Sequence, residues 1–184
     1  MHKLNQRLFF ALWPSHSTRT ALAEAQQLLK PSFKAQWVNP NNLHITLAFL
    51  GSVEAEKVAL ANAAADAVGG RPFELLLDCI DYWRKPRILC LTAGTTPTEL
   101  EQLAGDLAGN LRAAGFELDK RPFRAHLTLA RKAPYLPLAD ARLEWAIPWK
   151  STAFVLVESI KGPDGSRYSV IKSWELKQGK TTKT

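Results

Sequence analysis

The chain has 184 residues, of which 46% are hydrophobic and 22% charged, a balance typical of a globular protein with one domain or two small lobes. No segment approaches the roughly 18 consecutive apolar residues of a membrane helix, and residues 1–6 lack the apolar centre of a secretion signal. These features exclude a membrane-spanning or secreted class, so we expect a cytoplasmic protein with Cys79 and Cys90 reduced. The net charge of +7 favours a polyanionic partner such as nucleic acid.

The first part of the chain alternates strand and helix signals. Pro14 ends an aromatic-rich strand, and Ser15 or Ser17 can cap the helix that follows. The apolar stripe predicted for this helix consists of Ala21, Leu22, Ala25, Leu28 and Leu29. The predicted order is a strand over 7–12, a helix over about 15–29, a strand over 43–50 and an alanine-rich helix over 54–68.

The second part adds more strands around one long helix. Thr96 is the expected cap of this helix, because Pro97 and Glu99 follow it at the positions that favour a helix start. The predicted order is strands over 72–81 and 87–93, a helix from about 97, a strand over 124–130, a long strand over 146–160, a turn at 162–165 and a strand over 166–176. Alternation in the last strand predicts one shared face for Tyr168, Val170, Trp174 and Leu176.

Two segments of similar layout form a repeat. His44 follows Arg7 by 37 residues, and His126 follows Arg87 by 39, with a strand, a helix and a second strand in each segment. A pseudo-twofold relation between two such halves would place the two equivalent second strands near the shared axis.

Each of these second strands carries the pattern His-x-Thr. Side chains two residues apart on a strand share a face, so His44 and Thr46 point one way and the interleaved apolar residues point the other. The same holds for His126 and Thr128. A buried apolar face would fix the register of each strand and present an imidazole beside a hydroxyl on the opposite face.

Two histidines in opposite protonation states can act as base and acid in one hydrolytic step. One takes a proton from water, the other gives a proton to the leaving oxygen, and the hydroxyls of Thr46 and Thr128 can stabilise an anionic transition state. The scheme requires no cofactor and no metal. Two histidines without a carboxylate at helical ligand spacing are also too few for a usual zinc site. A framework role for each histidine is the alternative.

Other side chains have two interpretations. Arg131 could contact a phosphate at the rim of the site or remain a solvated surface charge. Phe10 and Tyr168 could stack on a nucleobase or pack in the core, and the same choice stays open for Trp37, Trp83 and Trp174. Basic residues cluster around the second motif, as expected for contact with an RNA backbone: Lys120, Arg121, Arg124, Arg131 and Lys132.

Four stretches resemble the 2H phosphoesterase superfamily, and in particular the bacterial RNA 2′,3′-cyclic phosphodiesterases, also known as 2′-5′ RNA ligases. They follow one another in the family's order. The stretches are Arg7-Leu-Phe-Phe-Ala-Leu12, Asn42-Leu-His-Ile-Thr-Leu-Ala-Phe-Leu-Gly51, Arg121-Pro-Phe-Arg-Ala-His-Leu-Thr-Leu-Ala-Arg131 and Ser166-Arg-Tyr-Ser-Val-Ile-Lys-Ser-Trp174.

The resemblance implies a bilobal, pseudo-twofold α+β fold in which two antiparallel sheets line a central cleft and helices lie outside. We expect residues 1–177 to form this single domain and residues 178–184 to form a flexible tail. The implied reaction is hydrolysis of an RNA terminal 2′,3′-cyclic phosphate to a 2′-phosphomonoester, with no metal or other cofactor. The family pattern makes His44 the proton donor and His126 the proton acceptor, with Thr46, Thr128 and Arg131 on the phosphate.

Two departures from the family pattern concern substrate contacts and not the proposed chemistry. Ala125 precedes the second histidine where proline is frequent, and Tyr168-Ser169-Val170 stands where Tyr-Thr-Pro is common. The expected partners are RNA ends with a 2′,3′-cyclic phosphate, such as tRNA fragments, and nothing demands more than a monomer. Two alternatives stay open: a non-catalytic module that binds RNA ends, and reversible 2′-5′ ligation at the same site.

Overall fold

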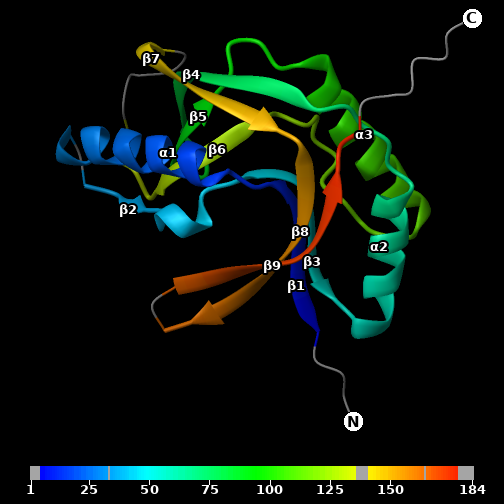
Figure 1. Ribbon diagram of the computed structural model, residues 1–184. Helices are drawn as coiled ribbons and strands as arrows, with labels where there is room; N and C mark the ends of the chain where they lie inside the picture. The colour runs from blue at the N-terminus through cyan, green and yellow to red at the C-terminus, as the bar shows by residue number, and fades with distance from the viewer. Residues whose placement is uncertain (1–4, 33, 136–140, 164, 178–184) are drawn as a thin grey trace, which may run out of the picture.

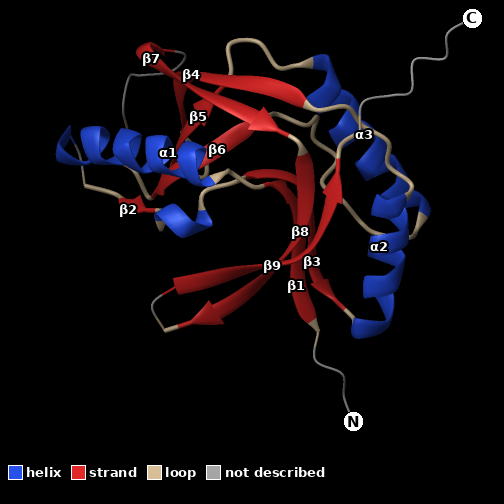
Figure 2. Ribbon diagram, in the orientation of Figure 1, coloured by secondary structure: helices blue, strands red, loops and turns tan. Residues whose placement is uncertain are grey.

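The computed structural model describes residues 5–32, 34–135, 141–163 and 165–177, and the expected tail over 178–184 lies outside them. Figures 1 and 2 show a curled sheet with helices against it. The strands are β1 (Gln6–Leu12), β2 (Gln36–Trp37), β3 (Ile45–Val53), β4 (Phe73–Trp83), β5 (Ile88–Thr92), β6 (His126–Arg131), β7 (Ala141–Ser151), β8 (Ala153–Gly162) and β9 (Gly165–Glu175). The helices are α1 (His16–Leu29), α2 (Val58–Asp66) and α3 (Thr98–Ala113), with short 3-10 turns at Lys30–Ser32, Pro40–Asn42 and Ala55–Lys57.

The sheet has the strand order β7-β4-β5-β6-β3-β1-β8-β9, with the short β2 paired to β6. The pairs are antiparallel, which confirms the expected α+β class. The two sheets of the expectation are joined into one, because Ile45 of β3 pairs with Leu127 of β6 at the centre. The two strands that carry the His-x-Thr motifs are therefore neighbours in the middle of the sheet.

The predicted repeat is visible in the topology. β1 and β3 are antiparallel neighbours connected through α1, and β5 and β6 are antiparallel neighbours connected through α3. The strand order reads symmetrically outward from the β6–β3 junction, as a pseudo-twofold axis at that junction requires.

The helices cover the apolar face of the sheet, and each long helix contacts the opposite half of the chain. Gln26 of α1 donates from Nε2 to the carbonyl of Leu129 in β6 at 2.9 Å, and α3 contacts β3. Leu22 of α1 and Leu107 of α3 are fully buried in the same core cluster as Ile45 and Leu127. These contacts between each helix and the opposite half of the chain hold the two halves together as one unit (Figure 2).

Two details of the predicted helices are wrong. Ser15 caps α1 as expected, accepting from the Thr18 N–H at 3.2 Å, but Leu28 is 68% exposed, because it lies on the outer side of α1, whereas the adjacent Leu29 packs against the core. In α3 the N-cap is Pro97, without a side-chain cap bond, so Thr96 is not the cap. No helix in the described ranges is long and apolar enough to cross a membrane.

The long strand predicted over 146–160 is two strands. β7 begins at Ala141 and pairs with β4, whereas β8 pairs with β1 in the other half of the sheet. The chain changes partner at Thr152, whose carbonyl accepts from the Leu176 N–H at 2.8 Å. Pro148 is tolerated because β7 is an edge strand. The open side of an edge strand forms no hydrogen bonds to a neighbouring strand, so proline can lack its N–H there.

The side chains predicted to share one face of the last strand lie on two different faces. Leu156 pairs with Lys172 and Val157 with Val170, so β9 contains one extra residue, Ile171, at a bulge. As a result Tyr168 packs beside Phe9, while Trp174 packs on the opposite face of the sheet in the main core. The predicted common face of Tyr168 and Trp174 is therefore wrong.

Candidate active site

The central strand pair brings the two motifs together. Ile45 and Leu127 are opposite one another and both 0% exposed, so the alternate residues on either side of them point away from the core. Continuing this antiparallel register by one residue places His44 across from Thr128 and Thr46 across from His126. Such cross-strand neighbours have Cβ atoms roughly 5 Å apart, and the diagonal His44–His126 pair lies at about 7–8 Å. Two imidazoles and two hydroxyls thus share one patch, and all four are partly exposed.

A backbone carbonyl two residues upstream orients each histidine ring. Nδ1 of His44 lies 2.7 Å from the carbonyl oxygen of Asn42, and Nδ1 of His126 lies 2.8 Å from that of Arg124. A carbonyl can only accept, so Nδ1 carries the hydrogen in both rings and Nε2 is left for chemistry. His44 Nε2 lies 3.0 Å from Thr46 Oγ1. This orienting role of Asn42 and Arg124 could not be predicted from the sequence, because it uses backbone atoms and leaves no mark in residue type.

The surroundings of both rings favour the neutral form. Burial lowers the pKa of His44 from 6.5 to about 4, and the charges of His126 and Arg131 act in the same direction. Burial also lowers the pKa of His126 below its ordinary value, helped by Arg124, Arg131 and Arg121. In each ring the bond to the carbonyl opposes the shift. A bound phosphate would raise the pKa of both rings, because its negative charge favours imidazolium.

The same shift gives His44 a measurable effect on stability. The folded pKa of about 4 is below the unfolded value of 6.5, so the unfolded chain binds the proton more readily and acid favours unfolding. We expect this group to remove about 3 kcal/mol of the free energy of unfolding between pH 7 and pH 4. Urea unfolding at both pH values, on wild type and His44→Gln, measures it. The wild type should lose more stability than the variant by this amount, and equal losses would contradict it.

Arg131 reaches the patch because β6 contains a bulge. Cys90 pairs with Thr128, Leu89 with Ala130 and Ile88 with Arg131, so Leu129 is an extra residue in β6. Ile88 and Cys90 are two apart on β5 and share a face, which puts Arg131 on the face of Thr128. In a regular strand, a residue three positions after Thr128 would point the other way. β3 has the matching bulge at Leu47, one residue after Thr46.

Aromatic rings surround His44. Trp13 stacks on it with centroids 5.9 Å apart, the Phe9 ring lies at 4.8 Å, and Tyr168 meets it edge-on at 5.4 Å. Phe10 does not belong to this group, because it is 0% exposed and packs against Phe154 and Trp174 on the other face. Of its two interpretations, packing in the core is therefore the one that the structure confirms, and base stacking is wrong.

Phe9 is the phenylalanine on the site face, a role that the sequence analysis missed. The register of β1 decides this, because Ala11 pairs with Thr46 and Phe9 lies two residues from Ala11. Phe9 is only 3% exposed, so it packs beneath the surface against the His44 ring.

Known proteins are similar to this chain. The family model described as LigT like Phosphoesterase matches residues 12–90. An RNA 2′,3′-cyclic phosphodiesterase of Escherichia coli (strain K12) is 32% identical over 174 residues, which cover 94% of this chain and 98% of that protein. The chain belongs to the LigT like phosphoesterase family.

Further members of the family agree over most of their length. An RNA 2′,3′-cyclic phosphodiesterase of Thermus thermophilus is 32% identical over 93% of this chain and 90% of its own. The crystal structure of E. coli LigT complexed with 3′-AMP matches with a TM-score of 0.86 and 32% identity, covering 95% of this chain and 99% of that chain.

The second histidine of this LigT like phosphoesterase has different neighbours from the first. The Trp83 ring lies 4.3 Å from the His126 ring, which assigns this tryptophan to the site. The Trp83 indole N–H donates to Asp81 Oδ2 at 2.8 Å, and Arg124 Nη2 donates to the same oxygen at 2.7 Å. Asp81 was not among the residues predicted for the site. A carboxylate among the apolar residues of β4 was the available signal.

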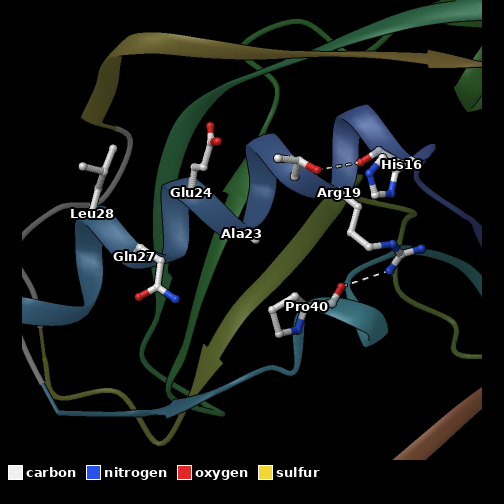
Figure 3. Close-up of a pocket in the computed structure, with 8 residues that line it drawn as sticks. His16, Arg19, Ala23, Glu24, Gln27, Leu28 and Pro40 are labelled. Carbon is white, nitrogen blue, oxygen red and sulfur yellow. Dashed lines mark hydrogen bonds between the residues drawn. The ribbon is translucent and has the colours of Figure 1, made fainter.

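A separate hollow lies on the outer side of α1 (Figure 3). Arg19 connects it to the site, because its guanidinium donates to the Pro40 carbonyl at 3.0 Å and lies 5.4 Å from the Trp13 ring. The hollow is lined by His16, Arg19, Thr20, Ala23, Glu24, Gln27, Leu28 and Pro40. None of the motif histidines or threonines lines it.

Proposed function

We propose that this chain hydrolyses RNA terminal 2′,3′-cyclic phosphates to 2′-phosphomonoesters. The observation that carries the proposal is the shared face of β3 and β6, where both Nε2 atoms are free of backbone bonds and a threonine stands beside each histidine. The relatives named RNA 2′,3′-cyclic phosphodiesterase support the same reaction.

In the proposed step, Nε2 of His126 takes a proton from water as the water oxygen attacks phosphorus. The bond between phosphorus and the 3′ oxygen breaks, and Nε2–H of His44 gives its proton to that oxygen. The product keeps the phosphate on the 2′ oxygen. Because burial lowers the pKa of His44, the substrate's own negative charge must raise that pKa before His44 can act as the acid.

The remaining groups act on charge and position. Thr46 and Thr128 can donate to the non-bridging oxygens, and Arg131 can offset the negative charge of the pentacoordinate state. Tyr168 is half-buried beside His44, which supports a contact with the terminal nucleobase. The basic residues around the second motif would follow the RNA backbone.

A nucleotide ligand is supported by the 3′-AMP complex of E. coli LigT. We extend this to RNA ends with a cyclic phosphate, including tRNA fragments, handled by a monomer in the cytoplasm. Gel filtration with light scattering tests the monomer, and a mass equal to twice that of the chain would contradict it.

Activity is tested with a short RNA that ends in a 2′,3′-cyclic phosphate, offered with and without a second RNA that has a free 5′ hydroxyl. Release of a 2′-phosphomonoester supports the proposal. Binding without any product would indicate a module that only recognises RNA ends. A joined 2′-5′ product would indicate that the 5′ hydroxyl can replace water in the same step.

Chelation should leave this reaction unchanged, because the proposed step moves protons between histidines and uses no Lewis acid. We expect the initial rate after incubation with EDTA to equal the untreated rate, with a parallel assay after dialysis against metal-free buffer. A rate that falls with EDTA and returns with one divalent cation would contradict the two-histidine mechanism.

A further inference from the structure

Asp81 is a buried carboxylate next to the site. It lies in β4 on the face shared with Cys90 and Thr128, because Asp81 pairs with Cys90 and Cys90 pairs with Thr128. Only 5% of it is exposed, and a carboxylate this deep is costly unless it is paired. Its Oδ2 atom accepts from both Arg124 and Trp83, as described above.

Both partners of Asp81 touch His126. The carbonyl of Arg124 accepts from His126 Nδ1, and the Trp83 ring packs on the imidazole at 48°. The Arg124 guanidinium also lies 5.4 Å from the Trp83 ring centroid, which closes the loop of contacts. Asp81 therefore holds the residue that sets the His126 tautomer and the ring that limits its rotation.

The two histidines are supported by different means. His44 packs among three aromatic rings, whereas Trp83 is the aromatic ring packed on His126 among the described residues. A ring held on one face and through one backbone bond needs those two partners to be fixed. We infer that Asp81 is a positioning residue for His126, acting through Arg124 and Trp83. The inference builds on the proposed function, in which His126 is the base.

Asp81→Asn tests this with little change of shape. The amide oxygen can still accept from Arg124 and Trp83, but the negative charge that holds Arg124 is gone. We expect kcat to fall about 10- to 100-fold with KM within about twofold of wild type, because a misaligned base weakens the chemical step more than binding. In ¹⁵N NMR spectra, His126 should change from a single Nδ1–H form to a mixture of tautomers, while His44 stays unchanged.

Asp66→Asn is the matched control. Asp66 Oδ1 also accepts from a lysine and an indole, Lys172 Nζ at 2.9 Å and Trp174 Nε1 at 2.6 Å, but Asp66 ends α2, and Trp174 packs on the core side of the sheet, opposite the face of the histidines. Trp83→Phe is a second variant, which keeps a smaller aromatic ring at this position and removes the N–H bond to Asp81. We expect no change in kcat for Asp66→Asn and a smaller loss for Trp83→Phe.

Unchanged turnover in Asp81→Asn, unchanged His126 signals, or an equal loss in Asp66→Asn would each overturn the inference. If Asp81→Asn does not fold, Trp83→Phe decides by the same two readouts. A wild type that binds RNA without hydrolysing it would contradict the proposed function alone, because the tautomer of His126 still reports on Asp81.

Discussion

Replacing His44 or His126 by alanine is expected to lower kcat/KM by about 10²- to 10⁴-fold, the range that general acid–base groups contribute. Each ring presents an Nε2 free of backbone bonds to one patch, so either variant removes one of the two proton transfers. The double variant should be hardly worse than the worse single one, because acid and base act in one step. Single-turnover assays on an RNA with a cyclic phosphate end measure all three.

His16→Ala provides the control for this comparison. His16 is exposed at the start of α1 and lies outside the motif patch, so its loss should leave the rate unchanged. Thermal unfolding near pH 7 should show that the variants fold. Full activity in either single variant at the motif positions would exclude the two-histidine mechanism.

Arg131→Ala is expected to lower kcat/KM by about 10²- to 10³-fold, the usual cost of removing one group that stabilises an anionic transition state. The bulge at Leu129 turns this side chain to the face of Thr128, and its charge lowers the pKa of both histidines. Arg131→Lys keeps the charge without the planar fork and should recover only part of the loss.

Lys150→Ala is the matched control for the arginine. It removes one positive charge from an exposed position on β7, an edge strand of the sheet, and should leave kcat/KM within about twofold of wild type. An equal loss in Lys150→Ala would mean that only the overall charge matters, and full activity in Arg131→Ala would remove this residue from the proposed mechanism.

Local patterns were enough to predict the motif strands. His44 and Thr46 alternate with Ile45 and Leu47, and this two-residue period determines which side chains leave the core. The repeat of strand, helix and strand also predicted that the two motifs lie near one axis, and the pairing of Ile45 with Leu127 confirms it. Both inferences depend on the pattern of apolar and polar residues along the chain, which can be read from a single sequence.

Register between distant strands was not available from such patterns. Phe9 and Phe10 are adjacent and chemically identical, and only the pairing of β1 with β3 decides which one faces His44. The bulge in β9 likewise separated Tyr168 from Trp174. A bulge moves every later side chain to the other face, and its position depends on the partner strand as much as on the strand itself.

The amino-acid sequence by itself determined the two His-x-Thr strands, their apolar faces, the repeated layout and the family. Only the tertiary structure decided that Arg131 lies on the site face and that Phe10 does not. It also decided that Asp81 binds Arg124 and Trp83, the two residues in contact with His126. The reason is physical. Alternation and burial act between residues close in sequence, whereas bulges and cross-strand pairs depend on which strands become neighbours, and the folded sheet alone determines this.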